Sequence, residues 1–207
     1  WVISALLILL VSFPLITGSR TVPLPVTLPE ESSRILSTLD ALPNGAPLLM
    51  IFDYDPALAG EMEAAAAPLV DRVLVLRNPR VTVLSTSPTG AALAEHFFEK
   101  TQARHNYQSG QNYINLGYLP GGTIGILSFA ESPRKAMPVM VGDVSAWDTT
   151  PVQDVDRFAD YAAILLITDQ SETARAWVEQ TAMHREGRPM LVVSSAQAAP
   201  MIQPYLY

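Results

Sequence analysis

Hydrophobic residues follow three different patterns along the chain, and each pattern predicts a different kind of structure. The first sixteen residues, Trp1 to Ile16, form an uninterrupted run without charge. The next segment, 17–30, is interrupted by three prolines. From residue 31 onward, apolar residues recur at helical spacing in some stretches and form short continuous runs in others, which is typical of helices alternating with buried strands. We therefore divide the chain into 1–16, 17–30 and 31–207.

The third segment predicts an ordered series of helices and strands. Helices are expected at 31–42, 57–77, 87–102, 123–130, 152–158, 171–183 and 198–207, and strands at 48–52, 80–84, 162–167 and 190–193. Pro68 is expected to kink or divide the second helix, because proline lacks an amide donor. The polar, glycine-rich stretch 105–122 is expected to be a long loop. The last helix is cut by the end of the chain, so the domain is expected to be truncated there.

Strands that are separated by helices usually pair in parallel, and the helices then cover both faces of the sheet. The fold predicted for 31–207 is therefore a three-layer, Rossmann-like α/β domain with a mostly parallel sheet. It is preceded by an N-terminal hydrophobic membrane segment. No GxGxxG sequence follows the first strand, so the dinucleotide-binding version of this fold is not supported.

The apolar run at the start predicts a transmembrane or signal-anchor segment. It is shorter than the roughly 18 to 20 residues that span a bilayer, but the chain begins without Met, and preceding residues of a longer protein would complete the span. A signal peptide, with Thr17-Gly18-Ser19 near its cleavage site, and a buried helix are the alternatives. Only Arg20 and Arg34 supply positive charge nearby, which favours an extracytoplasmic domain. The proline-rich segment 17–30 predicts an extended spacer.

Composition narrows the possible partners and cofactors. Hydrophobic residues make up 49% of the chain and charged residues 16%, which is enough apolar material for a folded core. The net charge of −7 would repel a polyanion, so nucleic acid is not expected as a partner. The absence of cysteine excludes disulfides, thiolate zinc sites and cysteine nucleophiles. The three histidines and the acidic stretch 143–160 lack the spacing of zinc or calcium sites, so no metal site is expected.

Every predicted strand is followed by small polar residues. They are Asp53 and Asp55, then Ser85, Thr86 and Ser87, then Thr168 and Asp169, and finally Ser194 and Ser195. The carboxyl ends of parallel strands meet at one edge of the sheet, where open α/β sheets bind their ligands. Ser, Thr and Asp also cap the helices that follow strands. Both interpretations remain open from the sequence.

The sequence Phe52-Asp53-Tyr54-Asp55 resembles the first motif of haloacid-dehalogenase-like phosphohydrolases. This resemblance implies that Asp53 attacks phosphorus and that Asp55 acts as acid and base. It also implies a magnesium ion. The chain departs from the family at Pro56 and Ala57, and its late acidic motif lacks a second nearby carboxylate.

The same resemblance extends weakly to residues farther along the chain. They are Thr86 or Ser85 after the second strand, Lys135 or Arg134 as a phosphate-neutralising cation, and Asp169 as a magnesium ligand.

A second unusual stretch is 112–122, which ends in Gly121-Gly122. If these glycines open a helix, the free amides there could hold an anion; a tight turn packed by Tyr113 and Tyr118 is the alternative. Together with the apolar start and the spacer, this stretch is similar to uncharacterised bacterial membrane-anchored α/β-domain proteins. That resemblance implies no known activity.

The sequence as a whole favours a binding module over an enzyme. The expected protein is a membrane-anchored, extracytoplasmic α/β domain that binds a ligand or a protein partner within a larger membrane protein, without a cofactor. The candidate ligand-binding residues are Asp53, Asp55, Ser85, Ser87, Gly121, Gly122, Thr168, Asp169 and Ser194. The alternative is a magnesium-dependent phosphohydrolase with Asp53, Asp55, Thr86, Lys135 and Asp169 as catalytic residues. An inert spacer domain, with no pocket and a large exposed apolar patch, is a third possibility.

Overall fold

The computed structural model describes residues 1–17, 30–101 and 107–205. It divides into two compact units, Trp1–Arg34 and Ile35–Tyr207. The first unit contains α1 (Val2–Thr17), a helix of 16 residues. Within the described residues, no helix is both long and apolar enough to cross a bilayer. The structure therefore does not support the predicted membrane segment, and most of the predicted spacer lies outside the described residues.

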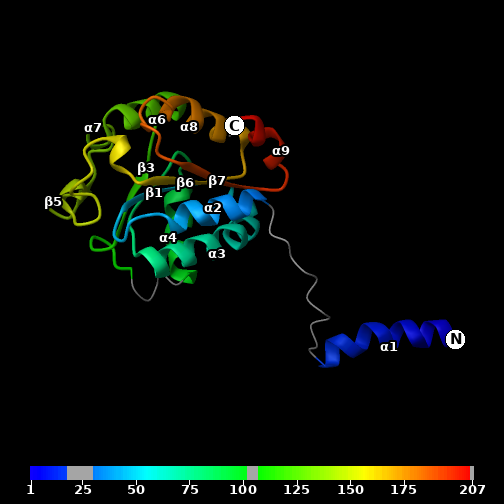
Figure 1. Cartoon of the computed structure of the whole chain (residues 1–207). Helices are drawn as coiled ribbons and strands as arrows, with labels where there is room; N and C mark the ends of the chain where they lie inside the picture. The colour runs from blue at the N-terminus through cyan, green and yellow to red at the C-terminus, as the bar shows by residue number, and fades with distance from the viewer. Residues whose placement is uncertain (18–29, 102–106, 206–207) are drawn as a thin grey trace. The chain divides into compact units, whose positions relative to one another are not determined.

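The second unit is built on a five-stranded sheet (Figure 1). Its strands follow the order β3-β2-β1-β6-β7, and every neighbouring pair is parallel. Their bounds are β1 (Pro47–Asp53), β2 (Arg80–Ser85), β3 (Tyr113–Tyr118), β6 (Ala163–Thr168) and β7 (Met190–Ser194). This confirms the predicted α/β fold with its parallel sheet. It also places β1 at the centre, between β2 and β6.

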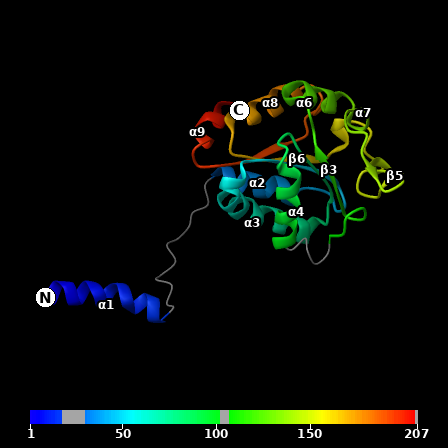
Figure 2. The same cartoon turned by 180° about the vertical axis from the view of Figure 1, so that it is seen from behind.

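Helices cover both faces of the sheet, because apolar side chains point alternately to either side of each strand. On β1, Leu48, Met50 and Phe52 belong to one core, whereas Leu49 and Ile51 belong to the other. The first core is closed by α2 (Glu30–Asp40), α3 (Ala59–Arg77) and α4 (Gly90–Lys100), and the second by α6 (Gly122–Glu131), α8 (Ser171–Thr181) and α9 (Ala199–Ile202), as Figures 1 and 2 show.

Short elements occupy the connections. Single-turn helices follow β1 (η1, Pro56–Leu58) and precede β6 (η3, Phe158–Asp160), and one ends the described chain (η4, Gln203–Tyr205). Between α6 and β6 lie α7 (Pro133–Ala136), a hairpin of β4 (Met140–Val141) with β5 (Val144–Ser145), and η2 (Ala146–Asp148). The sequence pattern did not predict α7 or the hairpin.

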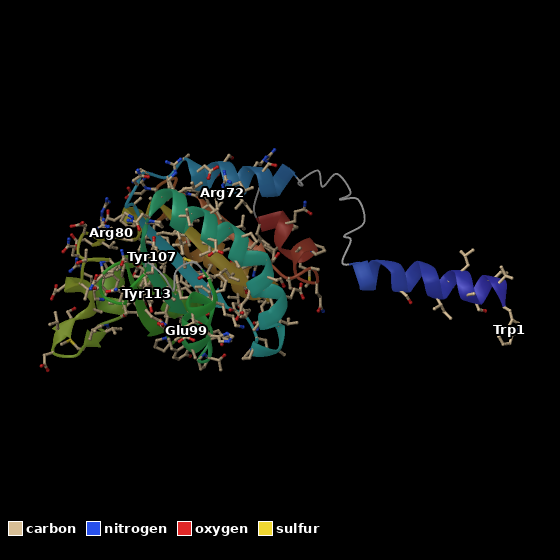
Figure 3. The ribbon with its side chains drawn as sticks, turned by 90° about the horizontal axis from the view of Figure 1, so that it is seen from below. Trp1, Arg72, Arg80, Glu99, Tyr107 and Tyr113 are labelled. Carbon is tan, nitrogen blue, oxygen red and sulfur yellow. The ribbon has the colours of Figure 1, made fainter. Side chains whose placement is uncertain are left out.

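A charged pair joins α2 to α3. Arg72 donates from Nε to Asp40 Oδ1 at 2.9 Å and from a terminal nitrogen to Oδ2 at 2.6 Å. This bidentate hydrogen bonding to Arg72 lowers the pKa of Asp40. Arg72 lies on the outer side of the domain, as Figure 3 shows, so solvent screens the pair and its contribution to stability is small.

The stretch 105–122 is not one long loop, because it contains β3. The strand is an edge strand whose polar residues bind α4: Tyr113 donates to Glu95 Oε2 at 2.8 Å, and Asn115 donates to Glu95 Oε1 at 2.8 Å. Its side chains alternate irregularly between buried and partly exposed. Polarity at an edge strand weakens the apolar pattern from which strands are predicted.

Three helix predictions were also wrong in detail. Pro68 does not divide α3, because it is exposed to solvent while Ala66 and Val70 hold the helix to the core. The stretch 152–158 forms turns rather than a helix, and the guanidinium of Arg134 binds its backbone carbonyls. The final segment 198–207 contains only α9 and η4 among its described residues.

Gly90 fixes the approach of α4 to the sheet. A Cβ atom at this position would lie 1.9 Å from Ser85 Oγ and 2.3 Å from the carbonyl oxygen of Phe52. Both distances are far inside van der Waals contact, and the second atom belongs to the backbone of the central strand. Only glycine therefore allows the first turn of α4 to sit against β1 and β2.

We predict that Gly90→Ala lowers the free energy of unfolding by about 2–3 kcal/mol, because the added methyl group must displace α4 or the strand ends. Gly60→Ala is the matched control: Gly60 also lies in the first turn of a helix, and nothing lies within 4 Å of a Cβ there. It should raise stability by about 0.5 kcal/mol. Urea unfolding followed by circular dichroism measures both. Equal effects of the two substitutions would contradict the close approach at Gly90.

Candidate functional site

A cleft of about 460 Å³ lies at the carboxyl ends of the central strands. Its lining comes from 53–56 at the end of β1 and directly after it, from 86–89 after β2, and from Gln170 and Thr173 at the start of α8, which follows β6. The chain proceeds from β1 to β2 and β3 on one side of the sheet and places β6 and β7 on the other. Ligands of open α/β sheets bind where the strand order reverses in this way.

Asp53 ends β1 and is held by residues from the neighbouring strand. Its Oδ1 lies 2.7 Å from Ser85 Oγ and accepts the backbone amide of Thr86 at 2.6 Å. The hydroxyl of Thr86 donates to Oδ2 at 2.7 Å. Ser85 Oγ also lies 2.7 Å from the carbonyl oxygen of Phe52 and 3.1 Å from that of Ser87, so its single proton is shared among three acceptors.

A fourth donor reaches Asp53 from the other side of the sheet. Trp177, which is fully buried on α8, donates from Nε1 to Asp53 Oδ2 at 2.9 Å. The carboxylate therefore connects β1, β2 and α8, and only 4% of the residue is exposed. Both of its oxygens are occupied by protein donors, which is the condition for burying a carboxylate without a large loss of stability.

Asp55 has a different environment, although it is only two residues away. It is exposed, and its Oδ1 accepts the amide of Ala57 at 2.8 Å, which caps η1. Its Oδ2 has no hydrogen-bond partner among the described residues. The capping interpretation is therefore correct for one oxygen of Asp55, while the other oxygen is open to a ligand.

The hydroxyls along the cleft mainly support its loops. Ser87 and Thr89 share a hydrogen bond of 3.2 Å between their hydroxyl oxygens. Thr168 Oγ1 accepts the amide of Gln170 at 3.1 Å, and the hydroxyl of Thr173 donates to the Gln170 side-chain oxygen at 3.5 Å. Each loop is thus held by short local contacts. Thr168 is fully buried and lies outside the cleft lining, whereas Thr89 is exposed within it.

Tyr54 lies between the two aspartates and also lines the cleft. It is 1% exposed, and its hydroxyl has no hydrogen-bond partner among the residues that the structure describes. Burial, followed by the nearby charge of Glu63, raises the pKa of Tyr54 above its ordinary value. The hydroxyl is therefore neutral across the physiological range.

The other predicted site residues lie outside the lining of this cleft. Lys135 and Gly121 line a separate hollow of about 480 Å³ along α6 and α7. Gly121, with a φ of 95°, and Gly122 begin α6 as a left-handed turn. Ser194 ends β7. Asp169 follows β6, and its buried Oδ1 has no partner within the described part of the chain.

Arg134, the other cation suggested by the phosphohydrolase resemblance, has a structural role. Its Nε donates to the carbonyl of Val155 at 2.9 Å and lies 3.0 Å from an oxygen of Asp156. Its guanidinium carbon lies 5.8 Å from the ring centroid of Trp147. These contacts hold the turns before β6.

The cleft residues do not fit the magnesium site that the phosphohydrolase resemblance implies. Magnesium requires several oxygen ligands in near-octahedral geometry. Both oxygens of Asp53 already accept hydrogen bonds from the protein. Among the residues that the structure describes, no three His, Cys, Asp or Glu side chains are grouped to hold a metal ion.

Sequence reasoning missed Trp177, Gln170 and Thr173. Trp177 is separated from Asp53 by 124 residues, so no local spacing connects them. Gln170 and Thr173 follow β6 on the side of the chain that the topology brings to β1. Gln170 and Thr173 could have been found from the sequence, because they are polar residues that closely follow the predicted strand at 162–167.

Comparison with known protein families, with curated proteins and with solved structures finds no match for this chain. The geometry of the cleft is therefore what bears on function.

We predict that Asp53→Asn lowers the free energy of unfolding by about 2–4 kcal/mol, because an amide NH₂ group would face a donor from Thr86 or Trp177. Asp55→Asn keeps the oxygen that caps η1 and should change stability by less than about 0.5 kcal/mol. Urea denaturation of the two variants measures the difference. If Asp53→Asn were as stable as the original chain, Asp53 would not have the structural role described here.

Proposed function

We propose that this chain is a binding module that holds a small polar ligand in the cleft at the carboxyl ends of β1, β2 and β6. The observation that carries the proposal is the hollow of about 460 Å³ at the point where the strand order reverses. A second support is the open Oδ2 of Asp55 in its lining. A partner protein is a less specific proposal. Exposed apolar side chains lie next to one another on α3 (Val75 and Leu76) and in the β4–β5 hairpin (Met140, Val141 and Val144), but they do not indicate the chemistry of a partner.

The same geometry gives little support to the phosphohydrolase alternative. Asp53, Asp55 and Thr86 do lie in one cleft, as that resemblance implies. However, the carboxylate that would act as nucleophile is buried and fully hydrogen-bonded, and Lys135 lines a different hollow. A positioned carboxylate that binds four protein donors is better suited to holding the fold than to attacking a substrate.

The binding proposal predicts that polar small molecules raise the melting temperature of the full chain, because a ligand that binds only the native state stabilises it. A ligand at a hundred times its Kd adds about 2.7 kcal/mol. A thermal-shift panel of sugars, polyols, amines, amino acids and organic acids in non-ionic detergent is the measurement. Any hit should be lost in Thr89→Trp, because the indole would fill the cleft from its exposed rim.

Thr150→Trp is the matched control, since Thr150 is also an exposed threonine but lies outside the cleft lining. A hit that persists equally in both variants would place the ligand elsewhere on the protein. A panel without any hit would remove the support for a small-molecule site.

The proposal includes attachment to a membrane through residues 1–16, with the α/β domain on the extracytoplasmic side. Residues 1–16 carry no charged side chain, and Leu6, Leu7 and Ile8 are exposed on α1. At a rise of 1.5 Å per residue the helix is roughly 24 Å long, somewhat shorter than the roughly 30 Å hydrocarbon core. The sparse positive charge after it, at Arg20 and Arg34, supports the orientation.

We predict that the full chain stays in the membrane fraction after an alkaline carbonate wash. A double substitution, Leu7→Lys with Ile8→Lys, should release it, because each lysine costs about 2.5–3.5 kcal/mol near the centre of an inserted helix. Ile124→Lys changes an equally exposed apolar residue on α6 and should have no effect. Recovery of the unaltered chain in the soluble fraction would contradict the attachment.

A further inference from the structure

We propose that the ligand of the cleft is a small organic cation that carries a primary ammonium group. This inference rests on the proposed function, namely that the cleft at the ends of β1, β2 and β6 binds a polar ligand. It goes further by specifying the charge of that ligand and the carboxylate that recognises it.

The charge of the lining is the first argument. The cleft is lined by the carboxylates of Asp53 and Asp55, by hydroxyls and by one amide. None of the described residues that line it is a lysine, an arginine or a histidine. An anionic ligand would therefore approach two negative groups without a compensating cation. The net charge of −7 adds to this field across the surface. Clefts lined by one sign of charge concentrate ligands of the opposite sign.

The distribution of free acceptors is the second argument. Neither oxygen of Asp53 is left to accept a hydrogen bond from a ligand, because protein donors already bind both. No donor from the described residues reaches Oδ2 of Asp55, and the residue is exposed at the same cleft. Asp55 is thus the carboxylate that recognises the ligand, and Asp53 belongs to the same lining.

The hydrogen-bonding capacity of the rim is the third argument. An ammonium group offers three donors and no acceptor. The rim offers the Asp55 carboxylate, the lone pairs of the Ser87 and Thr89 hydroxyls, and the side-chain oxygen of Gln170. Because a hydrogen bond to a carboxylate is stronger when the donor is also charged, an ammonium gains more from Asp55 than a hydroxyl does.

Three four-carbon probes separate charge from shape: butane-1,4-diamine, butane-1,4-diol and succinate. Isothermal titration of the full chain in non-ionic detergent should show binding of the diamine and no binding of succinate. The diol should bind at least about tenfold more weakly than the diamine, because its donors are neutral. The affinity for the diamine should also fall as salt is added.

Asp55→Asn should weaken diamine binding by at least about tenfold, while its remaining oxygen keeps the cap on η1. Asp143→Asn is the matched control, because it removes the same charge from another exposed aspartate, in the turn between β4 and β5. It should leave the affinity unchanged. If both substitutions weakened binding equally, only the overall charge of the protein would be acting, and the inference would be wrong.

The remaining outcomes also decide the question. Binding of succinate, or equal binding of the diol and the diamine, would overturn the inference that the ligand is a cation. If such a probe no longer bound the Thr89→Trp variant, the proposed function would still stand, because the cleft would be shown to bind a polar ligand. No binding of any of the three probes would overturn the cation inference as well. The wider thermal-shift panel would then decide the proposed function separately.

Discussion

The hydrogen bonds to the Asp53 carboxylate connect the parts of the domain that must meet for the cleft to exist. Ser85 and Thr86 reach it from β2, and Trp177 reaches it from α8 across the opposite face of the sheet. A buried carboxylate is costly unless its oxygens are fully paired. The position of α8 is therefore coupled to that of the β2–α4 loop. This loop and the first turn of α8 form two of the three sides of the cleft.

The two aspartates of the Phe52-Asp53-Tyr54-Asp55 sequence have opposite roles because the strand ends between them. Asp53 is the last residue of β1, so its side chain points to the core that contains Trp177. The chain then turns, and Asp55 precedes η1 at the surface. A carboxylate that supports the fold and a carboxylate that faces solvent are thus produced two residues apart. The resemblance to a catalytic pair lies in the spacing, whereas the environments differ.

Much of the fold could be predicted, because the central strands are continuous buried runs and leave little ambiguity. Edge strand β3 could not, since Tyr113 and Asn115 satisfy their polar groups through Glu95 on α4, a contact that no local pattern reveals. At the site, the polar ends of β1 and β2 were predictable from topology. The donor from Trp177 was not, and Lys135 was assigned to the site only by resemblance, whereas the structure places it along α7.

The strand order also has a consequence for when the cleft forms during folding. The central strand pairs with β2 soon after it in the chain, but its other neighbour, β6, begins only at Ala163. Contacts between such distant segments form slowly, because a long loop must close first. The chain can therefore assemble β1, β2 and their helices while β6 and α8 are still being synthesised. The half of the cleft that carries both aspartates precedes the half that completes it, so the cleft is complete only once β6 and α8 have been synthesised.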